Sequence, residues 1–176
     1  NLSPQRNAHN VAMLEAALDE VRAAMGDQAA ARLILHDENS GYSKGVNLAF
    51  RNSRGRWILV SNPDLLFTDG MIGGLLAALQ QDPTAGCTVP KGFWDPDLMG
   101  RLPPNILPTL GDLLWTALGE YVPAVSRRYG LRHAREAYAT WSDERPRPLA
   151  MMSGCLFLIE RDYFERIGLM DERFPL

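Results

Sequence analysis

The chain has 176 residues, 46% of them hydrophobic and 22% charged, which is the composition of a globular domain that can bury a substantial core. Its net charge of −3 argues against binding along a nucleic acid, so no nucleic-acid partner is expected. Cys87 and Cys155 form neither a disulfide framework nor a metal-ligand spacing, and no apolar run reaches the roughly 20 residues that span a bilayer, which together favour a cytoplasmic protein.

The first half of the chain alternates between helix and strand patterns. Apolar residues three and four positions apart after Ser3 predict a packed surface helix that ends near Gly26. The other predicted elements are a buried strand at 32–36, a glycine-containing loop at 39–47 that leads into a helix, a strand at 57–61, a helix at 72–79 and a strand near 87–89. This order predicts an α/β fold with a mostly parallel central sheet flanked by helices.

The second half is less regular. Residues 91–148 contain several prolines and one loosely amphipathic helix at 110–121, and we interpret them as an insertion over the ligand site. Regular order returns with a predicted strand at 151–160 and a short helix at 161–167. All 176 residues are expected to form a single domain.

Basic and aromatic residues gather within the insertion. They are Arg127, Arg128, Arg132 and Arg135, with Tyr121, Tyr129 and Leu131 beside them. Two interpretations fit this pattern. One is a solvated basic helix, and the other is contact with anionic lipid at a membrane surface.

The sharpest local feature is Asn62-Pro63-Asp64, which directly follows the strand at 57–61. In extended backbone, Asn62 and Asp64 project from the same side, where they can share one target. Magnesium takes one or two carboxylates together with substrate phosphates, so one hypothesis is a metal-bound diphosphate at this position. The alternative is a simple turn, for which all three residues are well suited.

A second candidate site is the loop at 39–47. Gly41 and Gly45 permit close backbone approach, a helix N-terminus favours anions, and Lys44 adds a cation. These features suit a nucleotide, although the spacing matches neither the P-loop nor the dinucleotide-binding fingerprint. An ordinary strand-to-helix connection is the alternative.

Two further candidates lie near the end of the chain. Gly154 falls within a predicted strand, and a glycine there often marks close approach by a ligand. A nucleophilic role for Cys155 is rejected, because no histidine shows local pairing with it. Asp171 and Glu172 form either part of a site or a solvated charged turn.

Taken in order, these motifs resemble glycosyltransferase family 2, especially its rhamnosyltransferase-like members. The resemblance rests on Asn39-x-Gly41-Tyr42-Ser43-x-Gly45-x-Asn47, Asn62-Pro63-Asp64, Ser153-Gly154-Cys155 and Asp171-Glu172-Arg173-Phe174. Asn1-Leu2-Ser3 also looks like the tail of the family's Asp-Asn-x-Ser loop. On this resemblance the chain is expected to be an internal piece, incomplete at both ends and inactive by itself.

The resemblance implies a GT-A fold, a nucleotide diphosphate-sugar donor and inversion at the anomeric carbon by single displacement. It also implies a divalent metal, Mg²⁺ or Mn²⁺, held by Asp64 with Asn62 in the place of the family's Asp-x-Asp motif. Asp171 and Glu172 become acceptor-side candidates, residues 91–148 an acceptor-side insertion, and the catalytic base is expected beyond Leu176. The implied donor-binding residues are Asn39, Gly41, Lys44, Gly45, Asn47, Asn62, Asp64 and Gly154.

The resulting hypothesis is a glycosyltransferase that moves a sugar such as rhamnose to a glycan or lipid-linked glycan, as in cell-wall polysaccharide synthesis. It would act in the cytoplasm, with peripheral contact at the inner face of the membrane as an option. Two alternatives stay open. One is a non-catalytic nucleotide-sugar-binding module, and the other is a sugar nucleotidyltransferase.

Overall fold

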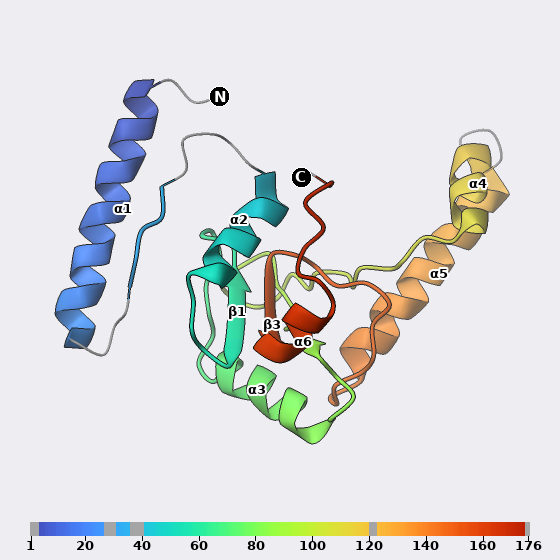
Figure 1. Cartoon of the computed structure of the whole chain (residues 1–176). Coiled ribbons are helices and arrows are strands. Elements are labelled where there is room, and N and C mark those ends of the chain that lie inside the picture. The colour runs from blue at the N-terminus through green and yellow to red at the C-terminus, as the bar shows by residue number, and fades with distance from the viewer. Residues whose placement is uncertain (1–3, 27–30, 36–40, 120–122, 175–176) are drawn as a thin grey trace. The chain divides into compact units, whose positions relative to one another are not determined.

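The computed structural model describes residues 4–26, 31–35, 41–119 and 123–174 (Figure 1). These residues group into two compact units. The first contains the chain up to Ser53 together with residues from Met170 onward, and the second contains Arg54–Leu169. That all 176 residues form a single domain stays a prediction.

The first unit contains two helices, α1 (Pro4–Met25) and α2 (Gly41–Arg51). The predicted first helix is confirmed, and Gly26 follows it with a φ of +60°, the left-handed conformation that commonly ends a helix. Its apolar stripe is largely exposed at Leu14 and Val21, so the predicted packing is not observed among the described residues. The helix α2 buries Ser43, Val46, Asn47 and Phe50.

The strand predicted at 32–36 is wrong over the residues that the structure describes. Residues 31–35 form no strand, and Ile34 and Leu35 are exposed, while His36 lies outside the described part. A strand needs a neighbour that pairs with its backbone N–H and C=O groups. In the described part of the first unit the other elements are helices. The segment instead accepts a hydrogen bond at the Ala31 carbonyl from the Arg22 guanidinium, at 3.1 Å.

The second unit is built on a three-stranded sheet with the order β1-β3-β2. The strands are β1 (Trp57–Ser61), β2 (Cys87–Thr88) and β3 (Leu156–Glu160), and β3 pairs antiparallel with both others. The predicted mostly parallel sheet is therefore wrong for the described residues. The two sequence-adjacent strands do run in the same direction, as predicted, but β3 lies between them and reverses both ladders. Helices and sheet together still make the unit α/β.

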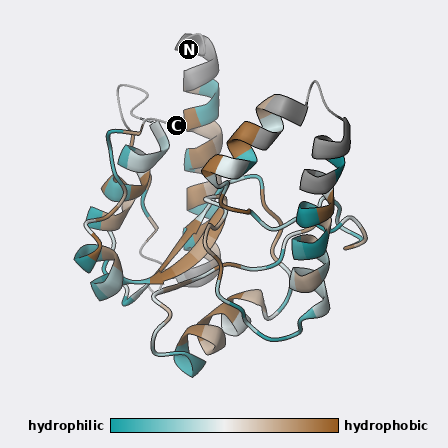
Figure 2. Ribbon diagram, turned by 90° about the vertical axis from the view of Figure 1, so that its right-hand side faces the viewer, coloured by the Kyte–Doolittle hydropathy of each residue, from teal (hydrophilic) through white to brown (hydrophobic). Residues whose placement is uncertain are grey.

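The helix α3 (Met71–Gln81), which was predicted, covers one face of this sheet. Leu75 and Leu79 pack with Leu158 of β3, and Trp57 and Leu59 of β1 lie against this cluster. Figure 2 shows the hydrophobic colouring concentrated on the strands. Alternation along the strands sends their other side chains to the opposite face. These are Ile58, Val60, Phe157 and Ile159, of which Phe157 is fully buried.

The strand β3 is shorter than predicted, because residues 151–155 form bends and irregular backbone rather than strand. It leads directly into α6 (Arg161–Arg166), which lies against β3 and buries Phe164. This short helix was predicted from its apolar side chains. The β1 and β3 ends that point toward residues 62 and 155 carry the candidate site.

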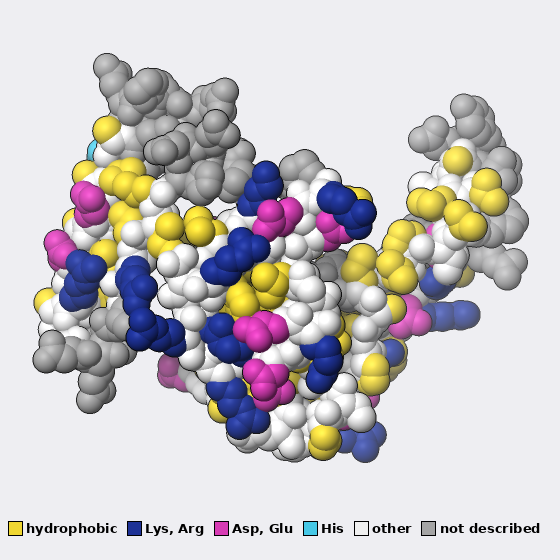
Figure 3. All heavy atoms as spheres, viewed as in Figure 1, with side chains coloured by type: hydrophobic (Ala, Val, Ile, Leu, Met, Phe, Trp, Pro, Cys, Tyr) yellow, Lys and Arg dark blue, Asp and Glu magenta, His cyan; other side chains and the backbone are white. Residues whose placement is uncertain are grey.

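Between β2 and β3 the chain forms a loop and a helical hairpin. The hairpin consists of α4 (Leu110–Gly119), which confirms the predicted helix over those residues, and α5 (Pro123–Ser142), which lies beside it. Tyr121 lies outside the described residues. Figure 3 shows hydrophobic and basic side chains on the surface of this hairpin. Among the described residues, no helix combines the length and apolar character needed to cross a membrane.

Candidate functional site

The motif Asn62-Pro63-Asp64 comes directly after β1, with Pro63 and Asp64 in a turn. Asn62 is half-buried and Asp64 is exposed. The backbone therefore turns at this motif, and the argument that strand alternation aims Asn62 and Asp64 in one direction does not apply. Both residues lie within three positions of the end of β1. That they share one target stays a prediction.

A hydrogen bond joins this turn to the second motif of the same unit. The backbone N–H of Asn62 donates to the carbonyl of Cys155, with an N–O distance of 2.8 Å. The hydroxyl of Ser153 lies 2.9 Å from the Cys155 Sγ, and the Cys155 N–H donates to the same hydroxyl oxygen at 3.3 Å. Residues 153–155 therefore form a tight polar bend that is bonded to Asn62. Two segments far apart in the chain meet here because β3 pairs with β1.

Cys87 of β2 has a partly buried thiol that contacts another sulfur-containing side chain. Its Sγ lies 3.4 Å from the Met152 Sδ. Burial raises the pKa of Cys87 to about 11, so the group remains a neutral thiol at neutral pH. A neutral thiol is a poor nucleophile and a poor metal ligand. In the part of the chain that the structure describes, no group of three or more His, Cys, Asp or Glu side chains is placed to hold a metal ion by itself.

In the first unit, Asn47 joins α2 to the segment at 170–174. Only 2% of Asn47 is exposed. Its amide donates to the Met170 carbonyl at 2.9 Å and to the Glu172 Oε1 at 2.8 Å, and its oxygen accepts from the Met170 N–H at 3.0 Å. The Ser43 hydroxyl adds a bond to the Phe174 carbonyl at 3.3 Å. Two of the motifs singled out in the sequence are thus bound to each other.

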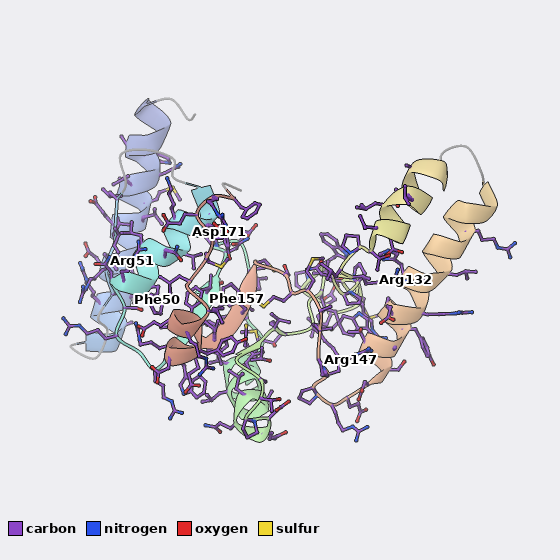
Figure 4. All side chains as sticks on the ribbon, turned by 45° about the vertical axis from the view of Figure 1, so that its right-hand side comes forward. Phe50, Arg51, Arg132, Arg147, Phe157 and Asp171 are labelled. Carbon is purple, nitrogen blue, oxygen red and sulfur yellow. The ribbon has the colours of Figure 1, made fainter. Side chains whose placement is uncertain are left out.

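The charged residues of this segment are engaged in ion pairs. Arg173 makes a two-pronged contact with Asp171, with Nε–Oδ1 and Nη2–Oδ2 distances of 2.9 and 2.6 Å. This contact lowers the pKa of Asp171. The bond from Asn47, followed by the charge of Arg51 at 3.4 Å, lowers the pKa of Glu172. Figure 4 labels Arg51 on α2 and Asp171. Both carboxylates stay ionised, which makes them weaker bases than ordinary Asp and Glu.

The predicted loop at 39–47 is helix from Gly41 onward, so that part of the prediction is wrong. Gly41 begins α2 with a φ of +77°, and Lys44 and Gly45 lie on its exposed side. Ser43, Asn47 and Phe50 recur at helical spacing and are buried on one face. The burial of this face outweighs the tendency of the two glycines to favour a loop. Asn39 lies outside the described residues. That Gly41, Lys44, Gly45 and Asn47 contact a donor stays a prediction.

Sequence reasoning missed Arg51 and the ion pair of Arg173. Asn47 and Arg51 are four positions apart, which places them on one face of a helix, and both reach the same Glu172 oxygen. This spacing was readable in the sequence. The partner at position 172 was not, because it lies more than a hundred residues later in the chain.

Asn47→Ala is expected to lower the free energy of unfolding by about 1–3 kcal/mol, because it leaves the Met170 backbone groups without their partner. Chemical denaturation of both proteins measures this loss. Asn52→Ala is the matched control. Its exposed amide bonds only locally to the Leu48 carbonyl, so a change within about 0.5 kcal/mol is expected. Equal losses in the two variants would contradict the role given to Asn47.

Comparison with known proteins adds the family. The family model described as Glycosyl transferase family 2 matches residues 14–168. The N-acetylglucosaminyl-diphospho-decaprenol L-rhamnosyltransferases of Mycobacterium tuberculosis strains CDC 1551 / Oshkosh and ATCC 25618 / H37Rv are each 31% identical to the chain over 121 residues. This covers 67% of the chain and 36% of each relative, so the chain spans little more than a third of their length. No solved structure matches. Because the family model covers most of the chain, the protein belongs to glycosyl transferase family 2 and is rhamnosyltransferase-like.

Proposed function

We propose that this chain forms part of a glycosyltransferase that moves a sugar, with L-rhamnose as first candidate, from a nucleotide diphosphate carrier to a glycan or lipid-linked glycan. Family membership supports sugar transfer, and the names of the two relatives suggest both the sugar and a lipid-linked acceptor. The proposed fold is GT-A, which the family implies. The proposed place of action is the cytoplasm, where nucleotide sugars are made, at the inner face of the membrane.

The observation that carries the proposal is the bond between the two turns of the second unit. Asn62-Pro63-Asp64 and Ser153-Gly154-Cys155 lie at one end of the β1–β3 pair and are joined through the Asn62 N–H and the Cys155 carbonyl. Ligands of open α/β sheets commonly bind at the ends of strands. We therefore assign Asn62, Asp64 and Gly154 to the donor side of the site.

The side-chain oxygens of Asn62 and Asp64 suit a divalent metal that binds together with the sugar donor. Asp64 offers a carboxylate and Asn62 an amide oxygen, both of which are hard oxygen ligands. Two side chains do not complete a coordination shell, which agrees with a site that relies on the phosphates of the donor. When bound, Mg²⁺ or Mn²⁺ would neutralise charge on the departing diphosphate.

Inversion follows from a single displacement in this proposal. The acceptor oxygen bonds to the anomeric carbon from the side opposite the diphosphate, the bond to the diphosphate oxygen breaks, and the acceptor proton passes to a base. Asp171 and Glu172 are proposed to orient the acceptor side rather than to be the base, because their ion pairs lower both pKa values. The base itself is proposed to be a different residue from these two.

Thermal shift with a panel of nucleotide diphosphate-sugars tests the proposal. A ligand that binds only the folded state raises the melting temperature by mass action. We expect a shift with one donor and Mg²⁺ or Mn²⁺ together, and a much smaller one after chelation. The absence of a shift with every donor would refute donor binding. A shift that survives chelation would refute the metal alone.

A further inference from the structure

The helix α4 exposes three leucines and buries an aspartate, which is the reverse of an ordinary amphipathic helix. Leu110, Leu113 and Leu114 are 80%, 57% and 65% exposed, whereas Asp112 on the same helix is only 6% exposed. Leu107, in irregular backbone just before the helix, is exposed as well. Helices of soluble domains normally bury leucine and expose carboxylates. The exposed leucines therefore form an apolar face that lacks cover from the described residues.

The inward orientation of Asp112 is fixed by specific bonds. The Thr109 N–H and hydroxyl donate to its Oδ2 at 2.7 and 2.8 Å, and the Asp112 N–H donates back to the Thr109 hydroxyl at 3.1 Å. This reciprocal pattern starts the helix in the manner of a capping box. Arg132 of α5 contacts both carboxylate oxygens. Bonds from Thr109, and then from Arg132, lower the pKa of Asp112 to about 2, so the pair stays ionised at neutral pH.

These bonds settle which side of α4 faces α5. The carboxylate is turned toward the partner helix, so the leucines are turned away from it. They cannot be buried by rotating α4 without breaking the Asp112–Arg132 pair. The apolar face is thus a built feature of the hairpin.

The helix α5 adds positive charge beside this face. It carries four arginines and one acidic residue in a chain whose net charge is −3. Arg127 and Arg135 are exposed, and so are Leu131 and Tyr138. Figure 3 shows apolar and basic side chains together on the hairpin. Exposed leucines and exposed arginines on one helical hairpin are typical of elements that lie at the interface of an anionic membrane.

We propose that the α4–α5 hairpin docks on an anionic lipid bilayer, with the α4 leucines in the acyl boundary and the α5 arginines at the headgroups. The inference rests on the proposed function for its purpose, since a lipid-linked acceptor is held at such a surface. A second copy of the chain, or another protein segment, would also bury the leucines. Charge complementarity favours the bilayer, because the exposed arginines of the same hairpin match an acidic surface.

Vesicle flotation of the 176-residue chain tests the hairpin. Phosphatidylcholine vesicles are compared with vesicles that also contain phosphatidylglycerol, at low and high salt. We expect binding to the anionic vesicles that weakens at high salt. The double variant Leu113→Ser/Leu114→Ser is expected to partition at least about tenfold more weakly. Arg127→Gln/Arg135→Gln is expected to lose most of the preference for anionic lipid.

Matched controls come from exposed residues outside the hairpin. Leu66→Ser replaces a leucine that is 83% exposed, and Arg145→Gln removes an exposed arginine, so both are expected to bind like the wild type. Circular dichroism confirms that the variants are folded. The proposal would be overturned if the wild-type chain bound no vesicles, or if it bound neutral and anionic vesicles equally. It would also be overturned if both hairpin variants bound as strongly as the wild type. Dimerisation that the leucine variant abolishes would overturn it in favour of a second copy. Donor binding, measured by thermal shift, does not depend on vesicle binding. Failure of the membrane proposal can therefore be distinguished from failure of the proposed function.

Discussion

Phe157→Ala is expected to lower the free energy of unfolding by about 3–5 kcal/mol, the loss typical of removing a large aromatic side chain from a core. Phe157 lies in β3, the central strand, and is fully buried (Figure 4). It stands opposite Val60 of β1 in the ladder, so its ring shares a face with that residue. Its loss removes buried apolar area and leaves a cavity at the middle of the sheet. Chemical denaturation followed by circular dichroism measures the change.

Two comparisons isolate the effect of the ring. Phe157→Leu keeps an apolar side chain at the position and is expected to cost less than Phe157→Ala. Leu66→Ala changes a leucine that is 83% exposed and is expected to alter stability by no more than about 0.5 kcal/mol. If Phe157→Ala costs no more than Leu66→Ala, the ring does not support the sheet as described.

Asp64→Asn is expected to abolish the metal-dependent part of donor binding. The change keeps the shape of the side chain and removes the negative charge that the proposed metal requires. With donor at a hundred times its dissociation constant, the wild type gains about 2.7 kcal/mol of stability. The variant is expected to gain almost none. Because Asp64 is exposed, its stability without ligand is expected to match the wild type within about 0.5 kcal/mol.

Asp69→Asn is the control for this second variant. Asp69 is an exposed acidic residue in the same unit, five positions after Asp64. Its replacement by Asn removes the same charge from the protein. Its donor-induced shift is expected to equal that of the wild type. A full shift in Asp64→Asn would remove Asp64 from the metal site, and equal losses in both variants would indicate a general charge effect.

The parts of the fold that could be predicted are those with a strong local period. The five residues of β1 and the eleven of α3 carry their own signal, a buried apolar run and a helical stripe. The antiparallel pairing of the sheet could not be predicted. β3 is separated from β1 by almost a hundred residues, and no local sequence signal indicates that it pairs between β1 and β2. The segment at 31–35 shows the reverse error, since its apolar residues suggest a strand that has no described neighbour in its unit.

The candidate site divides in the same way. The sequence pointed to Asn62 and Asp64 as oxygen ligands that follow a buried strand, and to Gly154 as a glycine within a predicted strand. The structure joins these two motifs through a backbone hydrogen bond. The sequence also pointed to Asn47, but not to the contacts with Met170 and Glu172 that occupy its amide. Such contacts depend on tertiary packing, and a single sequence gives no measure of that. The exposed leucines of α4 were equally hidden, because a leucine stripe predicts burial unless a neighbouring bond dictates the rotation of the helix.

The position of β3 between β1 and β2 also governs how the sheet can form. The two outer strands are made before β3 during synthesis, yet neither pairs with the other, and both pair with β3. Contacts of such large sequence separation close slowly, since the entropy of a long loop must be lost first. Until residues 156–160 leave the ribosome, β1 and β2 lack the strand that pairs with both of them in the described sheet, and unpaired strand edges are open to other chains. Assembly of the described sheet therefore waits for β3, and a nascent chain stalled before β3 is expected to aggregate more readily than one that has passed it.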